Sequence, residues 1–149
     1  MIALLLAAAA AITAANPDCA RMQPAAGFEG WGRAGGTALA VDRAAALKLE
    51  PAGNVRFDPP LTRKPKPNSY GGYFPLTVAK AGRYRIALSD RAWVDAVNHG
   101  KRLKSTAHMH GPACSGIAKI VAFDLPAGRS WLQISENGTS AISAMVSSH

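Results

Sequence analysis

Apolar and polar residues alternate through much of the second half of the chain. In residues 82–89, aromatic and aliphatic side chains occupy every second position, a period that is typical of a strand with one buried face. Residues 117–125 are apolar at almost every position, as expected of a central strand covered on both sides. Shorter patterns of the same kind predict further strands at 37–41, 46–49, 73–78, 93–97, 129–135 and 141–146.

Turn residues separate these segments at roughly 8–12-residue intervals, a spacing that indicates an antiparallel sandwich or barrel. The sequence therefore predicts an all-β fold, an antiparallel β-sandwich of about eight strands that form one domain over residues 37–149. A jelly roll is one arrangement of this kind. Residues 16–36 are rich in Pro, Gly and Ala, and we expect an irregular N-terminal arm there.

Residues 50–69 are predicted to form a surface loop. They contain five prolines, each of which lacks the backbone N–H that a strand in the middle of a sheet would donate. The stretch also carries Arg63, Lys64 and Lys66, so the loop is expected to be basic. The 73–78 strand contains Pro75, which places it at a sheet edge or a bulge.

The first residues of the chain have the composition of a secretory signal. Residues 2–15 are apolar and uncharged, and a run of about 14 is shorter than the roughly 20 residues that a membrane-spanning helix needs. We predict a signal peptide over 1–15, cleaved after Ala15, a periplasmic or secreted product, and no stable membrane span after processing. An amphipathic or buried N-terminal helix is disfavoured because the run has no polar face. A lipoprotein is disfavoured because Asn16-Pro17-Asp18 precedes Cys19 where small and aliphatic residues would be needed.

Cys19 and Cys114 both lie beyond the predicted cleavage site. In an oxidising compartment two such thiols usually pair, so we predict a disulfide that ties the arm to the body of the domain. One buried and one exposed thiol, or a metal-binding role for Cys114, are the alternatives.

The densest group of candidate metal ligands is His99, His108, His110 and Cys114. On an extended strand, His108 and His110 would point the same way, and imidazole with thiolate suits copper or zinc. A tetrahedral site would need His99 to fold over and Cys114 to stay reduced, which competes with the disulfide. The simpler interpretation is a loop whose histidines bond to backbone groups.

Two resemblances to known families follow from longer segments. The pattern Gly-x-Tyr-x-Ile-x-Leu, followed by Trp93-Val94-Asp95 and a glycine turn, resembles the β-sandwich of bacterial pre-peptidase C-terminal domains. Residues 70–74 and 105–117, including His-x-His-Gly-Pro-x-Cys-Ser-Gly, resemble a family of short secreted bacterial proteins labelled homogentisate 1,2-dioxygenase. This similarity covers most of residues 19–146. The label implies non-haem iron held by two histidines and a carboxylate, for which Asp95 and Glu136 are the candidates, although nothing in their spacing brings them to the histidines.

The remaining feature of the sequence that bears on function is its positive charge. Apolar residues make up 48% and charged residues 17% of the chain, which excludes a disordered protein, and Lys plus Arg outnumber Asp plus Glu by 17 to 9, for a net charge of +8. Lys101, Arg102 and Lys104 follow a predicted Asn-His-Gly turn and could meet an anionic ligand such as an envelope component or a polysaccharide. Nucleic acid is not expected, because no stacking-aromatic array accompanies the charges.

Of the three tryptophans, Trp131 is predicted to be the most exposed and the best candidate for a carbohydrate platform.

These observations favour a periplasmic or secreted, non-catalytic binding or accessory module with no cofactor. No Gly-x-Ser-x-Gly elbow or phosphate-binding glycine motif is present in the sequence. The alternative is a metal-binding protein or metal-dependent enzyme that uses His108, His110 and Cys114 with copper, zinc or iron.

Overall fold

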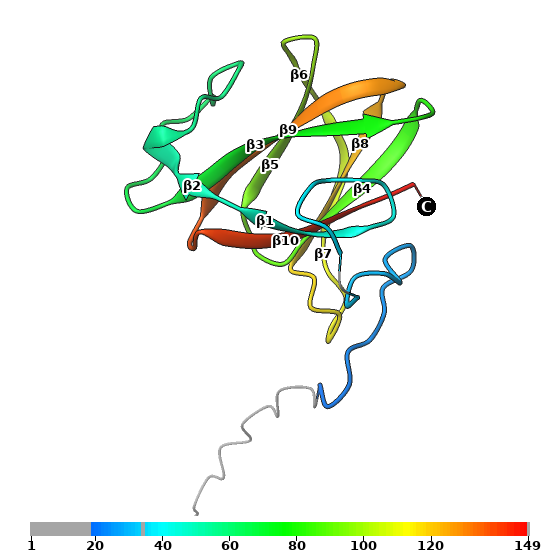
Figure 1. The fold of residues 1–149 in the computed structure, drawn as a ribbon. Helices are drawn as coiled ribbons and strands as arrows, with labels where there is room; N and C mark the ends of the chain where they lie inside the picture. The colour runs from blue at the N-terminus through cyan, green and yellow to red at the C-terminus, as the bar shows by residue number, and fades with distance from the viewer. Residues whose placement is uncertain (1–18, 34, 149) are drawn as a thin grey trace, which may run out of the picture.

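The computed structural model describes residues 19–33 and 35–148, so the predicted signal peptide lies outside the described residues. The described chain forms two five-stranded antiparallel sheets packed face to face, which confirms the predicted β-sandwich (Figure 1). The elements are β1 (Ala44–Lys48), β2 (Glu50–Pro51), the short 3₁₀ helix η1 (Ala52–Asn54), β3 (Tyr70–Val78), β4 (Gly82–Leu88), β5 (Trp93–Asn98), β6 (Lys101–Leu103), β7 (Ser105–His110), β8 (Lys119–Leu125), β9 (Gly128–Asn137) and β10 (Ala141–Ser147). Within these residues no helix has the length and apolarity that a membrane crossing requires.

The strand order is β1-β10-β4-β8-β7 in the first sheet and β2-β3-β9-β5-β6 in the second. Both sheets have a C-terminal strand near their middle, since β10 lies between β1 and β4, and β9 lies between β3 and β5. Pro75 pairs with Trp131 of β9, whereas β2 reaches only Tyr70 and Gly71 on the other side of β3. At Pro75, β3 is therefore itself the edge strand, as predicted, and the missing N–H is not needed for a ladder bond.

The core lies between the sheets and confirms the alternation seen in the sequence. Tyr84, Ile86 and Leu88 of β4 are buried in it. The other members come from most of the remaining strands and include Leu47, Leu76, Val94, Val121, Phe123, Leu132, Ile134, Ile142 and Val146. Burial of each such aliphatic side chain contributes about 1.5–3 kcal/mol, which makes this cluster the main source of stability.

The N-terminal arm covers the outer face of the first sheet. Phe28 is fully buried in a second apolar cluster with Ala87, Ile120 and Met145. The Arg85 guanidinium carbon lies 4.9 Å from the Phe28 ring centroid, and Arg85 donates a hydrogen bond to the Ala26 carbonyl. Because Val121 and Phe123 point inwards and Ile120 points to the arm, β8 is apolar on both faces, as the sequence predicts.

The proline-rich segment 52–69 lies against the outer face of the second sheet. Gln133 of β9 has no exposed surface, and its Nε2 donates to the Pro59 carbonyl at 2.7 Å. The Tyr73 hydroxyl donates to the Asp58 carbonyl at 2.9 Å. Burial, followed by the nearby Asp58 charge, raises the pKa of Tyr73 above its ordinary value. Residues 55–69 form a surface loop, as predicted, whereas residues 50–54 of the predicted loop form β2 and η1. Side-chain hydrogen bonds hold the carbonyls of the loop to the sheet.

Two other local predictions differ from the structure. Residues 37–41 form isolated bridges and no strand, because Asp42 has a φ of 60° and turns the chain before β1. Residues 105–110 form a strand where a loop was expected. All six residues of β7 are exposed at the edge of the first sheet, so neither face needs apolar residues, and the sequence shows no alternation there.

Candidate functional site

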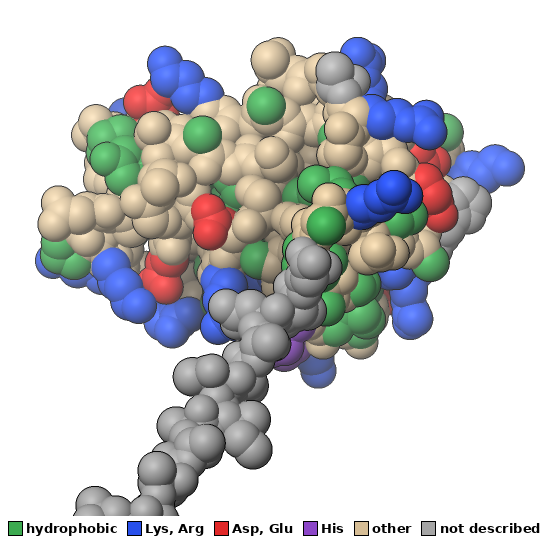
Figure 2. Space-filling view, turned by 90° about the horizontal axis from the view of Figure 1, so that it is seen from below, with side chains coloured by type: hydrophobic (Ala, Val, Ile, Leu, Met, Phe, Trp, Pro, Cys, Tyr) green, Lys and Arg blue, Asp and Glu red, His purple; other side chains and the backbone are tan. Residues whose placement is uncertain are grey.

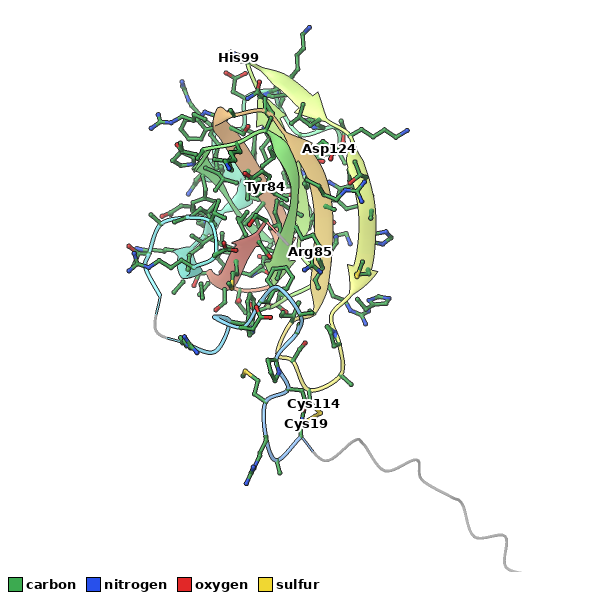
Figure 3. All side chains as sticks on the ribbon, turned by 90° about the vertical axis from the view of Figure 1, so that its right-hand side faces the viewer. Cys19, Tyr84, Arg85, His99, Cys114 and Asp124 are labelled. Carbon is green, nitrogen blue, oxygen red and sulfur yellow. A yellow bond between two sulfur atoms is a disulfide. The ribbon has the colours of Figure 1, made fainter. Side chains whose placement is uncertain are left out.

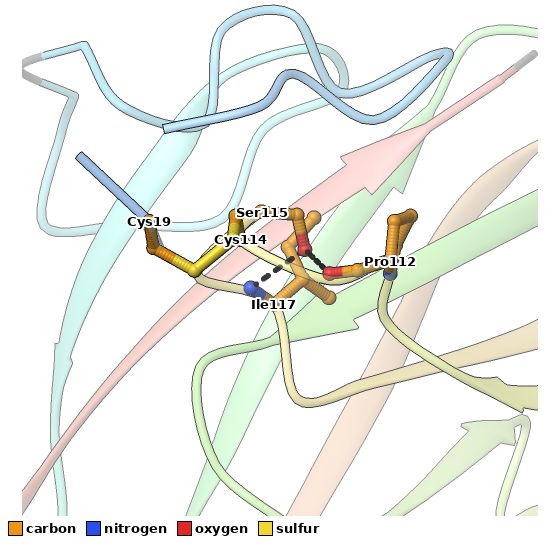
Figure 4. The surroundings of a disulfide bond; sticks show 5 residues. All are labelled: Cys19, Pro112, Cys114, Ser115 and Ile117. Atoms are coloured by element: carbon orange, nitrogen blue, oxygen red, sulfur yellow. Dashed lines mark hydrogen bonds between the residues drawn. A yellow bond between two sulfur atoms is a disulfide. The ribbon is translucent and has the colours of Figure 1, made fainter. Parts of the chain in front are cut away.

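The predicted disulfide between Cys19 and Cys114 is present, with the two Cα atoms 5.2 Å apart (Figure 4). It joins the start of the described arm to the loop between β7 and β8. The Gln23 N–H adds a hydrogen bond of 2.8 Å to the Cys114 carbonyl, so the arm follows this loop beyond the covalent bond.

The surrounding Gly-Pro-x-Cys-Ser-Gly residues shape the loop that receives the arm. The buried Ser115 hydroxyl donates to the Pro112 carbonyl at 2.6 Å and accepts from the Ile117 N–H at 3.1 Å (Figure 4). A Cβ at Gly111 would collide with the Ile117 carbonyl, and Gly116 has a φ of +75° beneath the Trp31 ring. This part of the motif therefore has an architectural role.

His99 lies far from Cys114, the other end of the predicted metal group (Figure 3). His99 and Gly100 have φ values of 48° and 72° and form the two-residue turn between β5 and β6. Figure 3 shows His99 at one end of the molecule and Cys114 at the other. His108 and His110 are exposed on β7.

Among residues 19–33 and 35–148, no three His, Cys, Asp or Glu side chains are grouped to hold a metal ion. The Cys114 sulfur is in the disulfide. The two candidate carboxylates lie near cations, Asp95 Oδ2 at 3.6 Å from Arg102 Nε and Glu136 Oε2 at 3.9 Å from Lys66 Nζ. Metal binding by His108 and His110 stays a prediction.

The three basic residues predicted to bind anions differ in environment. Lys101 is the first residue of β6 and Lys104 follows the strand, and both are exposed. Arg102 is partly buried, and in addition to the ion pair with Asp95 its Nη2 donates to the Pro60 carbonyl at 2.8 Å. Arg102 therefore braces the proline-rich loop against the sheet, while the two lysines remain at the surface.

Trp93, at the start of β5, is the centre of a different cluster. Its ring is 45% exposed, and its Nε1 donates to Asp95 Oδ2 at 3.0 Å. The Arg63 guanidinium carbon and the Lys119 Nζ lie 4.8 and 5.1 Å from the ring centroid, within the range of cation–π attraction. Trp131, the tryptophan that the sequence favoured as exposed, is half-buried and stacks on Tyr73 with ring centroids 4.4 Å apart.

Lys119 crosses from the first sheet towards the second. It lies on the inward side of β8, and its Nζ donates to the Ala92 carbonyl at 3.1 Å. Burial lowers the pKa of Lys119 below the ordinary lysine value, and the Asp95 charge opposes this shift. A pocket of about 230 Å³ adjoins the ammonium and is lined by Trp93, Val94, Asp95, Ser105, His108, Lys119 and Val121.

Two further depressions, of about 390 and 460 Å³, flank the proline-rich loop. They share Lys64 and Pro65, and Arg63 lines both the 390 Å³ depression and a small cavity beside Trp93. The basic residues of this loop, all exposed, are Arg56, Arg63, Lys64 and Lys66. Figure 2 shows Lys and Arg side chains spread around one face of the molecule, with acidic side chains between some of them.

Comparison with protein-family models, with curated proteins and with solved structures finds no match to this chain. The family resemblances of the sequence stay predictions, and the function has to be inferred from the geometry and charge of the residues themselves.

Proposed function

We propose that the protein is an exported, non-catalytic binding module for an anionic polysaccharide, which it binds through the basic side chains of the proline-rich loop. The observation that carries this proposal is the charge of that loop. Residues 52–69 present Arg56, Arg63, Lys64 and Lys66 against a single acidic residue, Asp58.

The proline-rich loop has a fixed conformation, which favours a binding role for its charged side chains. Hydrogen bonds from Tyr73, Arg102 and Gln133 fix the loop carbonyls at 58–60, and the prolines restrict the backbone further. Less conformational entropy is then lost when a ligand binds. The depressions on either side of the loop offer an extended surface that suits a chain better than a compact small molecule.

Export is the part of the proposal that rests on the N-terminal sequence and the disulfide. Disulfides persist in oxidising compartments, which agrees with a signal peptide over 1–15. A periplasmic or secreted protein of net charge +8 would meet the anionic polymers of a cell envelope directly.

The test is titration with polygalacturonate, with neutral dextran as the control polymer. Binding to polygalacturonate is expected to weaken steeply as salt is added, because exposed charges are screened within about 10 Å at 0.1 M. The variant Lys64→Gln/Lys66→Gln should bind about three- to tenfold more weakly. The matched control Lys48→Gln/Lys80→Gln neutralises two exposed lysines outside the loop and should bind like the parent protein. Equal binding of dextran, or no effect of salt, would contradict the proposal.

A further inference from the structure

The pocket beside Trp93 exists because β6 is too short to cover β5. β6 pairs only with Ala96–Asn98, so the edge of β5 from Trp93 to Asp95 has no neighbouring strand on that side. The chain then crosses to the first sheet at Lys104 and continues as β7. The open edge of β5 consequently faces β7 and β8, and the residues of the 230 Å³ pocket come from all three strands.

The polar lining of the pocket includes one ammonium group, that of Lys119. The ammonium of Lys119 has three N–H donors, of which one is used by the Ala92 carbonyl. Asp95 is the one acidic residue among those that line the pocket, and its carboxylate contacts Arg102 and the Trp93 indole N–H. His108 and Ser105 supply further hydrogen-bonding groups.

The pocket also has an apolar lining. The Trp93 ring, Val94 and Val121 form it. A pyranose ring has an apolar face of C–H groups that packs on an indole, and an acidic sugar adds a carboxylate at its rim. A volume of about 230 Å³ lies below the range of about 300–1,000 Å³ typical of drug-sized ligands, so it suits a single ring.

We propose that this pocket binds one hexuronate ring, with its carboxylate on Lys119 and its apolar face on Trp93. The inference rests on the proposed function for its ligand class, and it makes Trp93 and Lys119 the subsite that recognises an acidic sugar. Arg63 contacts Trp93 and also lines the depression along the loop, so a polymer on the loop has a direct path to this subsite.

The experiment is calorimetric titration with the monosaccharide galacturonate, with galactose as the matched neutral sugar. Galactose is expected to bind at least tenfold more weakly, since it lacks the charge-assisted bond. Lys119→Met and Trp93→Ala should each lower galacturonate affinity about tenfold or more, while Lys48→Met should leave it unchanged. On the parent protein, galacturonate should shift the indole N–H resonance of Trp93, assigned with Trp93→Phe, a readout that does not depend on the folding of Lys119→Met.

The outcomes separate the two proposals. Equal affinity for galacturonate and galactose, or an unmoved Trp93 resonance, would overturn the subsite even if polygalacturonate still binds. Galacturonate binding that depends on Lys119, without any polygalacturonate binding, would overturn the proposed function and leave the subsite in place. If both hold, Lys64→Gln/Lys66→Gln should weaken the polymer and leave the affinity for the monosaccharide within about twofold.

Discussion

Removal of the disulfide between Cys19 and Cys114 tests how much the covalent attachment of the N-terminal arm stabilises the folded domain. The double variant Cys19→Ser/Cys114→Ser deletes a bond between residues 95 positions apart. In the chain-entropy account, a crosslink over about 100 residues restricts the unfolded chain enough to stabilise the native state by about 4.7 kcal/mol. With an ordinary entropy of unfolding for a chain of this size, about 4–5 kcal/mol corresponds to a fall in Tm of roughly 10–20 °C.

Urea denaturation followed by tryptophan fluorescence measures this free energy. Trp31 lies in the arm and Trp93 and Trp131 in the second sheet, so the signal reports on both parts. If the arm stays docked in the variant, the midpoint should fall, and the dependence of the free energy on urea (the m-value) should rise, because the unfolded chain without the crosslink is less compact. A lower m-value would show that the arm has left the first sheet, because less surface is then exposed on unfolding.

The control is reductant. It should lower the stability of the parent protein to that of the variant and leave the variant itself unaffected. A loss below about 1.5 kcal/mol at an unchanged m-value would refute the reasoning, since it would mean that the bond places little restriction on the unfolded chain.

Three further predictions concern single sites. Phe28→Ala should lower the free energy of unfolding by about 3–5 kcal/mol, because the ring is fully buried against the first sheet. The control is Met22→Ala, since Met22 is 59% exposed and its removal should have little effect. A loss below about 1 kcal/mol for Phe28→Ala in urea titration would show that the arm packs loosely. Galacturonate affinity should decline as the pH rises towards 10.5, earlier than for an ordinary lysine, because burial lowers the pKa of Lys119 and the deprotonated amine has no charge. Lys119→Arg keeps its charge over this range and leaves Arg63, Asp95 and His108 in place, so an equal decline in that variant would count against the role of Lys119. Metal analysis of protein purified without a histidine tag should find less than one copper, zinc or iron per chain, and stoichiometric metal that is lost in His108→Ala would favour the metal-binding alternative.

The fold could be predicted because burial follows the strand period wherever a strand has one covered face. Tyr84, Ile86 and Leu88 alternate because the second sheet lies on one side of β4. The disulfide could be predicted from the presence of two cysteines behind a predicted export signal. The edge strand β7 could not be found in this way, because a strand exposed on both faces places no apolar requirement on its sequence.

The candidate site was harder to predict than the fold, for a related reason. Trp93 is exposed because β6 ends before reaching it, which is a property of the neighbouring strand and not of the residues around Trp93. Arg102 and the two lysines beside it look equivalent in sequence, yet Arg102 turns inwards to Asp95. Lys119 is a charged residue in an otherwise apolar strand, which the sequence shows. Its place beside Trp93 could not be predicted, because it depends on how the two sheets pack together.

The position of β9 and β10 has a consequence for the order of assembly. A nascent chain that ends before residue 128 lacks β9 and β10, so β1 has no strand to pair with, and β3 and β5 are left unconnected. Neither sheet can therefore form in full until β9 and β10 have been synthesised. Any truncation that removes the last two strands should abolish the native state as a whole, since both layers depend on them.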